Sequence, residues 1–446
     1  MEGVNAEVGV GGEPGRVARV VVGAVVGAGD ARAAMERAWE EPGAGPVLLV
    51  AFGKASAEMA GWAAARLGGG LAGGVVVGVP GRVGAASVPG CVERFEADHP
   101  LPTERNVRAA ERLREVVSAF ARRADGTVVC LISGGGSAHL TLPAGRLALE
   151  DLRRVNGALQ RQGAPIEELN CVRKHTEELK GGGLARLAAP ARVDAYVLSD
   201  VMGDRLDVIA SGPVTPDPTT FAGAREVMAR RGCVGVSAAV DEHLARGAAG
   251  EIGETPKPGE KVFENVRSTV IAGNGAAVEA VRKALVGAGL SVVSVETGAE
   301  GEASEVGKRL GRTMSSGVRG AWEAGGRPVV WIVGGEWTVR VGDGEGVGGP
   351  SQELALACAI ELERAGLGAR AGVVSFSSDG VDGPTDAAGA ALTGGDVERA
   401  LAEGMDLGRM LGEHDSHTAL ARMGALIRTG PTGTNVNHVA VGVVWG

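Results

Sequence analysis

The stretch Thr127–Ile132, with the sequence TVVCLI, is followed at once by Ser133–Ser137, with the sequence SGGGS. An uninterrupted apolar run of this length predicts a strand buried on both faces, as in a parallel sheet covered by helices. The three glycines after it predict a turn whose backbone amides can surround an anion. In an open α/β sheet, ligands bind at the carboxyl ends of the strands. The stretch therefore predicts an α/β fold with an anion-binding loop at 133–137, and a plain flexible turn is the alternative.

Short apolar runs alternate with amphipathic helical patterns on both sides of this stretch. Continuously apolar strands that alternate with helices are typical of a parallel sheet with helices on both faces. In the first half we expect strands at 47–52, 74–79, 127–132 and 195–199, and helices at 55–67, 104–122, 150–162 and 221–230. In the second half we expect strands at 268–272, 290–295, 328–333, 372–376 and 438–444, and helices at 276–288, 303–315, 354–364 and 397–403.

A polar stretch rich in proline and glycine, at residues 249–265, separates the two halves. It has almost no apolar periodicity, which is typical of a connection between domains. We therefore expect two α/β domains: one with a parallel sheet at 1–255, and a second at 256–446. Residues 1–15 are rich in glycine and aperiodic, so we expect them to be loose.

Composition narrows the classes of partner and compartment. The chain has 446 residues and a formal net charge of −9 without a long basic run, which argues against nucleic acid or an anionic membrane as partner. No apolar run reaches the roughly 20 residues of a membrane span. Five widely spaced cysteines without a CxxC pair indicate buried thiols in a reducing compartment, and hence a cytoplasmic protein. The 75 glycines, with 19 prolines and no three-residue period, exclude collagen and indicate glycine-rich loops.

Two further stretches resemble nucleotide-binding patterns. Phe52–Ser56, FGKAS, resembles the end of a P-loop, but Leu48 stands where that pattern requires glycine. Lys54 in this turn can still place its ammonium group on a phosphate, although a surface lysine is an equal alternative. Residues 344–349 match the dinucleotide pattern GxGxxG, which is weak evidence in a chain so rich in glycine.

Charged residues gather in two kinds of segment. Residues 169–183 carry four cationic or near-cationic groups: Arg173, Lys174, His175 and Lys180. Facing a phosphate these groups would form an electrostatic clamp, whereas facing solvent they would be an ordinary basic helix. The loops at 199–204 and 378–386 carry clustered aspartates after strands, which are common Mg²⁺ ligands or general bases. Asx turns would explain single aspartates, but less readily the whole set.

Two pairs with helical spacing do not complete a recognisable site. His414 and His417 lack a third clear ligand, so we expect no metal site there. Cys171 and His175 can contact each other on a helix, but nothing nearby completes a catalytic triad.

Six motifs occur in an order that resembles the glycerate 2-kinases of the MOFRL type. They are ISGGGSA at 132–138, LNCVRKHTEELKGGGLA at 169–185, LSDVMGDRLDVIASGP at 198–213, GGEWTV at 334–339, SSDGVDGPTDAAGA at 377–390 and TGPTGTNVNHV at 429–439. The resemblance covers the chain from about residue 45 to its end. It implies a Rossmann-like N-terminal domain at 1–255, a second α/β domain at 256–446 and an active site in the cleft between them. It also implies transfer of the γ-phosphoryl group of ATP to the 2-hydroxyl of D-glycerate, with Mg²⁺. The implied partners are ATP and a small hydroxy acid, and a homodimer is left open.

The resemblance also implies roles for individual residues. Lys54 would neutralise charge on the transferring phosphoryl group, and Asp200 and Asp204 would hold Mg²⁺ or accept the glycerate hydroxyl proton. The implied phosphate-binding loop is Ser133, Gly134, Gly135, Gly136 and Ser137, and the implied cationic segment is Asn170, Arg173, Lys174, His175 and Lys180. The implied residues of the second domain are Glu336, Gln352, Glu353, Asp379 and Asp382.

One departure from the family pattern concerns charge at the transferring phosphate. Where the family usually reads GGRNQE, residues 348–353 read GGPSQE, so Pro350 replaces the arginine and Ser351 the asparagine. Proline suits the first turn of a helix, so the fold should persist. Loss of a transition-state arginine can cost about 10³-fold in rate, unless Arg340 or Arg173 substitutes for it. His139 and His417 also stand where apolar or aromatic residues are expected.

Two other functions stay open at this stage. A hydroxypyruvate reductase using NAD(P)H would place its dinucleotide on residues 344–349, but no acidic ribose-binding residue follows at the expected distance. A kinase-fold protein with a changed hydroxy-acid substrate, or a binder that has lost turnover with the arginine, is the second alternative.

Overall fold

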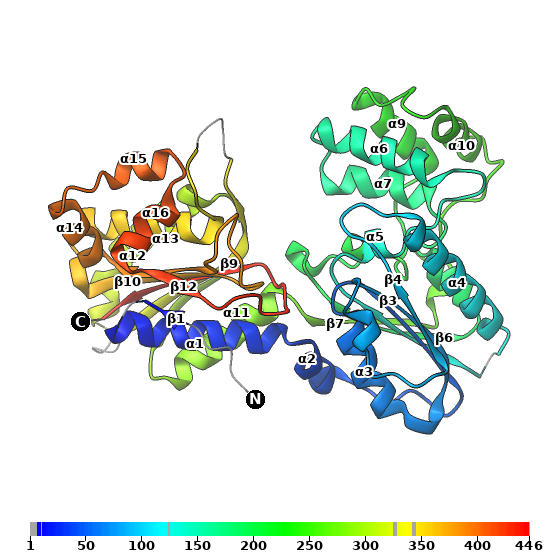
Figure 1. The fold of residues 1–446 in the computed structure, drawn as a ribbon, viewed down its shortest axis with the longest axis horizontal. Helices are drawn as coiled ribbons and strands as arrows, with labels where there is room; N and C mark the ends of the chain where they lie inside the picture. Colours follow the sequence, from blue (N-terminus) through cyan, green and yellow to red (C-terminus); the bar gives the residue numbers. More distant parts are fainter. Residues whose placement is uncertain (1–6, 10, 124, 324–327, 341–344, 446) are drawn as a thin grey trace. The chain divides into compact units, whose positions relative to one another are not determined.

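The apolar runs of the first half of the chain form a six-stranded sheet in the computed structural model, which describes residues 7–9, 11–123, 125–323, 328–340 and 345–445. The strand order is β4-β3-β2-β5-β6-β7, and the pairs from β4 to β6 are parallel (Figure 1). Its strands are β2 (Val47–Phe52), β3 (Leu71–Gly78), β4 (Val92–Glu96), β5 (Thr127–Ile132), β6 (Arg192–Leu198) and β7 (Val266–Ala272). The central strands β2 and β5 are buried along their whole length, as their apolar sequences predict.

Helices and short turns connect these strands. The helices are α2 (Ala31–Ala38), α3 (Ser56–Leu67), α4 (Glu104–Ala121), α5 (Gly136–His139), α6 (Leu149–Arg161), α7 (Ile166–Thr176), α8 (Gly183–Ala188), α9 (Phe221–Arg230) and α10 (Ala238–Ala248). One-turn 3₁₀ helices lie at Gly68–Gly70, Val83–Ala85, Met202–Asp204, Ile209–Ser211 and Lys261–Phe263. Helices α6, α7, α9 and α10 form a cluster with an apolar core of its own (Figure 1). This cluster carries the segment that the sequence singles out as cationic.

The second half of the chain forms a seven-stranded sheet with the order β1-β12-β11-β10-β13-β9-β8. Its strands are β1 (Glu7–Val8), β8 (Ser291–Glu302), β9 (Val329–Thr338), β10 (Ala371–Ser377), β11 (Gly389–Thr393), β12 (Leu426–Arg428) and β13 (His438–Val444). All neighbouring strands pair antiparallel except β8 and β9, which are parallel. The sheet is therefore mixed, although the sequence shows the same alternation of strands and helices as the first half.

The helices of the mixed sheet are α1 (Gly12–Gly29), α11 (Asn274–Gly287), α12 (Ala303–Glu323), α13 (Pro350–Arg364), α14 (Gly394–Ala402), α15 (Leu407–Gly412) and α16 (Ser416–Met423), with a 3₁₀ turn at Gly368–Arg370. Helix α13 is buried along most of its length and packs against α12, β10 and β11. Its residues Leu354, Ala355, Leu356, Cys358, Ala359, Ile360 and Leu362 belong to the main apolar core of this half.

The chain divides into two compact units, which confirms an α/β protein with two domains. We call them the parallel-sheet unit, residues 31–199 and 204–271, and the mixed-sheet unit, residues 200–203 and 272–446 together with the described residues before Ala31. This division differs from the expected one at 255/256, because β7 joins the parallel sheet and α1 packs on α11, β10 and β11. The start of the chain also differs from the expected loose segment, since Glu7–Val8 pairs with β12 and α1 begins at Gly12. Residues 1–6 and 10 lie outside the described residues.

Two expectations about compartment can be compared with the structure. Among the described residues, no helix has both the length and the apolar character that crossing a bilayer requires. The five cysteines carry free thiols, and four of them are buried as expected. Cys91 differs, because it lies at an exposed position just before β4.

The place of α1 in the mixed-sheet unit gives a first prediction. Val21 is fully buried on α1 whereas Arg19 is exposed on the same helix. Replacing Val21 by aspartate buries an unpaired charge, so we expect Val21→Asp to cost about 3–5 kcal/mol of unfolding free energy in this unit. Hydrogen exchange should rise in β10 and α11 and stay unchanged in β2 and β5, with Arg19→Asp as the control. Faster exchange in β2 and β5 instead would contradict this assignment of α1.

Candidate active site

The glycine-rich loop and Lys54 meet where β5 and β2 end. The amide of Ser133 donates to the carbonyl of Phe52 over 3.1 Å, and the amide of Lys54 donates to the carbonyl of Gly134 over 2.9 Å. Gly53 has a φ of +114°, and a Cβ there would lie 2.3 Å from the Ser133 hydroxyl oxygen. The two turns approach so closely that only glycine fits at position 53. The structure thus brings the sequence-predicted loop and lysine together.

The loop has backbone donors to offer an anion. Among the described residues, the amides of Gly134 and Gly135 have no acceptor within the protein. The exposed side chain of Lys54 passes over the loop, since a Cβ on Gly135 would lie 3.3 Å from its Cγ. Two unpaired amides beside an ammonium group suit a phosphate oxygen.

His99 and His139 flank the same loop; the sequence singled out His139 as an unexpected residue after the loop and gave His99 no role. A Cβ on Gly135 would lie 3.1 Å from the Cδ2 atom of His99, so that ring contacts the loop. Burial, and then the Lys54 charge, lowers the pKa of His99. His139 is fully buried, with its ring centre 6.1 Å from that of His99. Burial lowers the pKa of His139 to about 4, so the ring is neutral at pH 7.

A chain of side-chain hydrogen bonds runs from the loop to α7. The hydroxyl oxygens of Ser137 and Ser211 are 3.0 Å apart, and Ser211 donates to Oδ1 of Asn170 over 2.8 Å. A hydroxyl has one hydrogen, so the Ser137 hydroxyl must donate to Ser211. Ser211 has a φ of +61° and is fully buried. The sequence placed Asn170 and Ser137 in the site but gave Ser211 no role; its position in the ASGP turn was the available signal.

Lys180 supports the loop from within the protein. Its ammonium group donates to the carbonyl of Ser137 over 2.8 Å and forms an ion pair with Glu177. Both side chains are buried, and burial lowers the pKa of Lys180 and raises that of Glu177. Lys180 therefore contacts the phosphate-binding loop at the backbone oxygen of Ser137.

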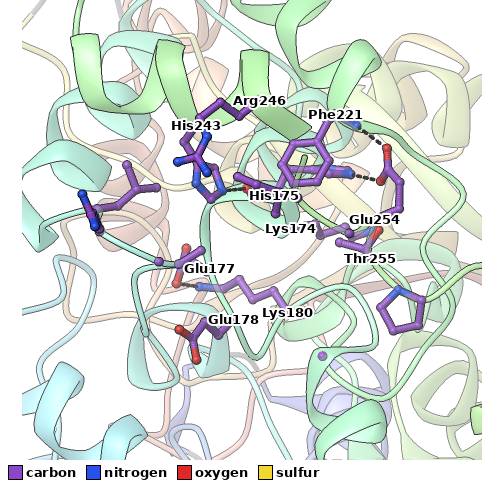
Figure 2. Close-up of a pocket in the computed structure, with 18 of the residues that line it drawn as sticks. Lys174, His175, Glu177, Glu178, Lys180, Phe221, His243, Arg246, Glu254 and Thr255 are labelled. Carbon is purple, nitrogen blue, oxygen red and sulfur yellow. Dashed lines mark hydrogen bonds and ion pairs between the residues drawn. The ribbon is translucent and has the colours of Figure 1, made fainter. Parts of the chain in front are cut away.

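The cationic groups of α7 line a polar cavity of about 800 Å³ in the parallel-sheet unit (Figure 2). Lys174 pairs with Asp217 over 3.3 Å, and His175 Nε2 lies 3.1 Å from a Glu254 carboxylate oxygen. The Nδ1 atom of His175 lies 2.7 Å from the backbone carbonyl oxygen of Cys171, so the spacing of the two residues brings the imidazole to the backbone of Cys171. These groups are neither an open clamp nor a solvated basic helix, because each has a buried partner.

Arg173, on the same helix, has a different environment. Its Nε atom donates to Oδ1 of Asn156 over 3.3 Å, and burial lowers its pKa. Its predicted role beside the transferring phosphate stays a prediction.

Asp204 lies after β6, at the edge of the parallel sheet where β2 and β5 also end. Its backbone has a φ of +51°, and its Oδ1 atom is buried without a hydrogen-bond partner among the described residues. A buried carboxylate oxygen without a donor is costly unless a cation or ligand group meets it. Asp204 thus fits the ligand type that Mg²⁺ prefers.

In the mixed-sheet unit, Asp200 and Glu336 lie near each other. The pKa of Glu336 is raised by desolvation and then by the nearby carboxylates of Asp200 and Glu300, although the side chain stays partly in solvent. Glu300 is the register partner of Glu336 across β8 and β9. The side chain of Asn437 donates to the backbone carbonyl of Asp200 over 3.2 Å. This gathering of carboxylates suits a divalent cation or a proton acceptor.

Asp382 and Gln352 form one buried arrangement at the start of α13. The Asp382 carboxylate accepts from the amides of Ser351 and Gln352 over 2.9 and 2.8 Å, and from the Gln352 side chain over 3.0 Å. Burial raises the pKa of Asp382 to about 6, against the effect of these donors. Pro350 is the first residue of α13, as its sequence position predicts. Asp382 thus satisfies the first amides of α13, and a contact with substrate stays a prediction.

Glu353, Asp379 and the two histidines complete the predicted set. Glu353 is buried and lies 3.0 Å from the Nδ1 atom of His414. His417 instead pairs with Asp386 over 2.9 Å. The Asp379 carboxylate accepts from the Ser377 hydroxyl and from the Val381 amide, each over 3.0 Å, which is the turn geometry of aspartate.

The glycines of the dinucleotide-like pattern have a structural explanation. Gly344 lies outside the described residues. A Cβ on Gly346 would lie 1.9 Å from the Glu413 carbonyl, and one on Gly349 would lie 2.3 Å from the Asp382 carbonyl. These two glycines are required by close packing on the chain itself, so the pattern needs no dinucleotide to explain it.

A glycine-rich loop beside a lysine in one α/β unit, and clustered carboxylates in the other, are the kinds of group that small-molecule kinases use for phosphoryl transfer. Residues 17–245 match a domain family described as a domain of unknown function (DUF4147), and residues 329–438 match the MOFRL family. A D-glycerate 2-kinase from Thermotoga maritima is 39% identical, over 89% of this chain and 90% of that protein. A putative hydroxypyruvate reductase from Agrobacterium vitis is 40% identical, over 95% and 93%.

A solved structure agrees with this relationship. The crystal structure of glycerate kinase from Thermotoga maritima superposes with a TM-score of 0.85 at 35% identity, over 96% of this chain and 99% of that one. The chain belongs to the MOFRL-type glycerate kinases, which confirms the resemblance seen in the motifs.

The buried imidazole beneath the loop gives a prediction about pH. Because the pKa of His139 is about 4 in the folded protein and ordinarily about 6.5, the unfolded chain binds the extra proton between these values. Stability should fall as pH decreases from 6.5 to 4, by about 3 kcal/mol from this residue. Urea unfolding at several pH values should show this slope, reduced in His139→Phe. The control His417→Gln should keep it, and an unchanged slope in His139→Phe would contradict the assignment.

Proposed function

We propose that this protein transfers the γ-phosphoryl group of ATP to the 2-hydroxyl of D-glycerate, giving 2-phosphoglycerate and ADP. The printed functions of its relatives support the substrate and the reaction class. The observation that carries the proposal is the joint position of the loop amides and Lys54 at the ends of β5 and β2. We also propose a cytoplasmic location, supported by the five free cysteines.

The parallel-sheet unit supplies the phosphate-binding groups in this proposal. The amides of Gly134 and Gly135 bind phosphate oxygens, and Lys54 neutralises the charge that develops on the transferring group. The Ser137 hydroxyl donates its only hydrogen to Ser211, so it has no hydrogen left to donate to a phosphate oxygen. Binding therefore depends on backbone amides and one ammonium group, which position the phosphate without covalent chemistry.

The aspartates after β6 supply the remaining chemistry. Either Asp204, with its unpartnered buried oxygen, or Asp200, with Glu336 nearby, would hold Mg²⁺. When bound, the ion neutralises charge on the phosphate oxygens of the nucleotide. The carboxylate of these two that does not bind the ion accepts the proton of the glycerate 2-hydroxyl.

A coupled assay of ADP release with D-glycerate, ATP and Mg²⁺ tests the activity, and ³¹P NMR identifies the phosphorylated oxygen. A parallel assay of NADH oxidation with hydroxypyruvate tests the reductase that the name of one relative suggests. We expect ADP release and no NADH oxidation. Absence of ADP release across a panel of hydroxy acids would overturn the kinase proposal.

Removal of the charge at Lys54 should stop turnover without unfolding the protein. We expect Lys54→Ala to lower kcat about 10²- to 10³-fold, because the transferring phosphoryl group loses its nearest cation. Asp200→Asn should cause a similar loss. The matched control is Lys261→Ala, which removes an exposed lysine of the same unit. Full activity in Lys54→Ala would show that its assigned role is wrong.

The proline at the start of α13 gives a gain-of-function prediction. Pro350 is only partly buried, so an arginine can extend from this position without disturbing the core. We expect Pro350→Arg to raise kcat at least about tenfold with little change in KM, because an added cation acts on the transition state. Pro350→Gln removes the proline without adding charge and serves as the control. Equal rates in the two variants would show that another cation already supplies this charge.

A further inference from the structure

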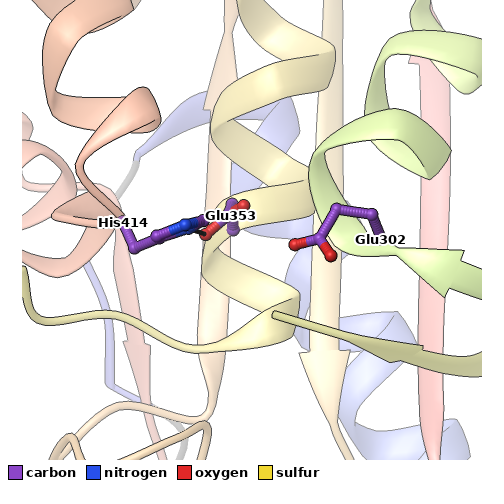
Figure 3. Close-up of side chains that lie close together, drawn as sticks. All are labelled: Glu302, Glu353 and His414. Carbon is purple, nitrogen blue, oxygen red and sulfur yellow. Dashed lines mark hydrogen bonds and ion pairs between the residues drawn. The ribbon is translucent and has the colours of Figure 1, made fainter. Parts of the chain in front are cut away.

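Glu302, Glu353 and His414 gather at one point of the mixed-sheet unit although they are far apart in the sequence. Glu302 ends β8, Glu353 lies in the first turns of α13, and His414 follows α15. One ligand atom from each side chain lies within 4.8 Å of the other two. The three side chains point toward one another (Figure 3). This is an arrangement of two carboxylates and one imidazole.

Neighbouring bases offset the charge of this cluster only in part, since the Lys308 charge lowers the pKa of Glu353 while its ion pair is with Glu305. Two carboxylates at this separation repel each other, and one imidazole offsets at most one of them. Lys308 and Arg309, one to two turns into α12, pair with Glu305 and Glu296 over 2.7 and 2.8 Å. The Glu302 carboxylate accepts one hydrogen bond among the described residues, from the backbone amide of Arg340 over 3.3 Å. A divalent cation would remove the repulsion.

We propose that Glu302, Glu353 and His414 bind a divalent transition-metal ion, of which Zn²⁺ is the best match. An imidazole with two carboxylates is a common ligand set for Zn²⁺, with water in the fourth position. Mg²⁺ and Ca²⁺ prefer oxygen ligands alone, so the histidine selects against them. Its three ligand residues do not include the aspartates proposed to hold Mg²⁺, and it needs neither ATP nor glycerate.

Local structure supports this use of the three residues. Glu353 is 1% exposed, so its carboxylate is held in place by the core around α13. His414 has a φ of +59°, an uncommon conformation for a residue other than glycine. Glu302 also lines a groove of about 730 Å³ along α12, which gives an ion a route from solvent. A bound ion would join the β8–α12 junction, α13 and the α15–α16 turn, and would stabilise the folded unit.

The test uses the full-length protein, stripped with a chelator and kept free of nucleotide and glycerate. Calorimetric titration with Zn²⁺ should show one tight site, and Co²⁺ should give the visible absorption of a bound transition metal. Glu302→Gln and His414→Gln should each weaken Zn²⁺ binding at least about 10- to 100-fold. They should also lose the rise in melting temperature that Zn²⁺ gives to the parent protein. A large excess of Mg²⁺ should leave Zn²⁺ bound.

The matched control is His417→Gln, which removes the nearby histidine that pairs with Asp386. It should bind Zn²⁺ like the parent protein. Glu302 is partly exposed, so Glu302→Gln keeps the test valid if His414→Gln does not fold. The proposal would be overturned if no tight site were found, if Mg²⁺ displaced Zn²⁺, or if His417→Gln lost binding as fully as His414→Gln. Kinase activity is measured separately, so failure of the proposed function would leave this result intact.

Discussion

The hydrogen bond from the Lys54 amide to the Gly134 carbonyl joins the carboxyl ends of β2 and β5, and the candidate site depends on it. It holds the backbone of Lys54, the basic residue of the Phe52–Ser56 turn, against the glycine-rich loop. It requires close approach, which a side chain at position 53 would prevent. Because β2 and β5 are paired in register as central strands, this contact follows directly from the parallel sheet. The fold and the phosphate-binding geometry thus have a common origin.

The sequence predicted best those elements whose signals are local. β2, β5, α9 and β13 were placed with their observed bounds, because each is an apolar or periodic run bounded by turn residues. Helix α1 and strand β1 were not predicted as parts of the mixed-sheet unit. Their partners lie at the other end of the chain, and short-range patterns carry no information about such pairing. For the same reason the antiparallel order of the second sheet could not be read from its alternation of strands and helices.

The site shows the same limit at the level of single side chains. The loop at 133–137 and Lys54 were predicted and lie together, since each follows a strand of one parallel sheet. The cationic segment was recognised, but its acidic partners, the buried Asp217 and the partly exposed Glu254, were not, so its groups resembled an open clamp. His414 lacked a third ligand in the sequence because Glu302 and Glu353 come from distant elements. Charge type can be read from sequence, whereas charge pairing requires the fold.

The division of the chain into units has a consequence for its synthesis. Helix α1 is translated before the whole parallel-sheet unit, whereas its packing partners α11, β10 and β11 are translated after that unit. In the sequence, the parallel-sheet unit comes between α1 and these partners, and its last strand, β7, is translated before them. Domains generally fold as units during translation, so this unit can reach its final form while the buried face of α1 is still uncovered. The apolar face of α1 therefore stays uncovered until α11, β10 and β11 have been translated.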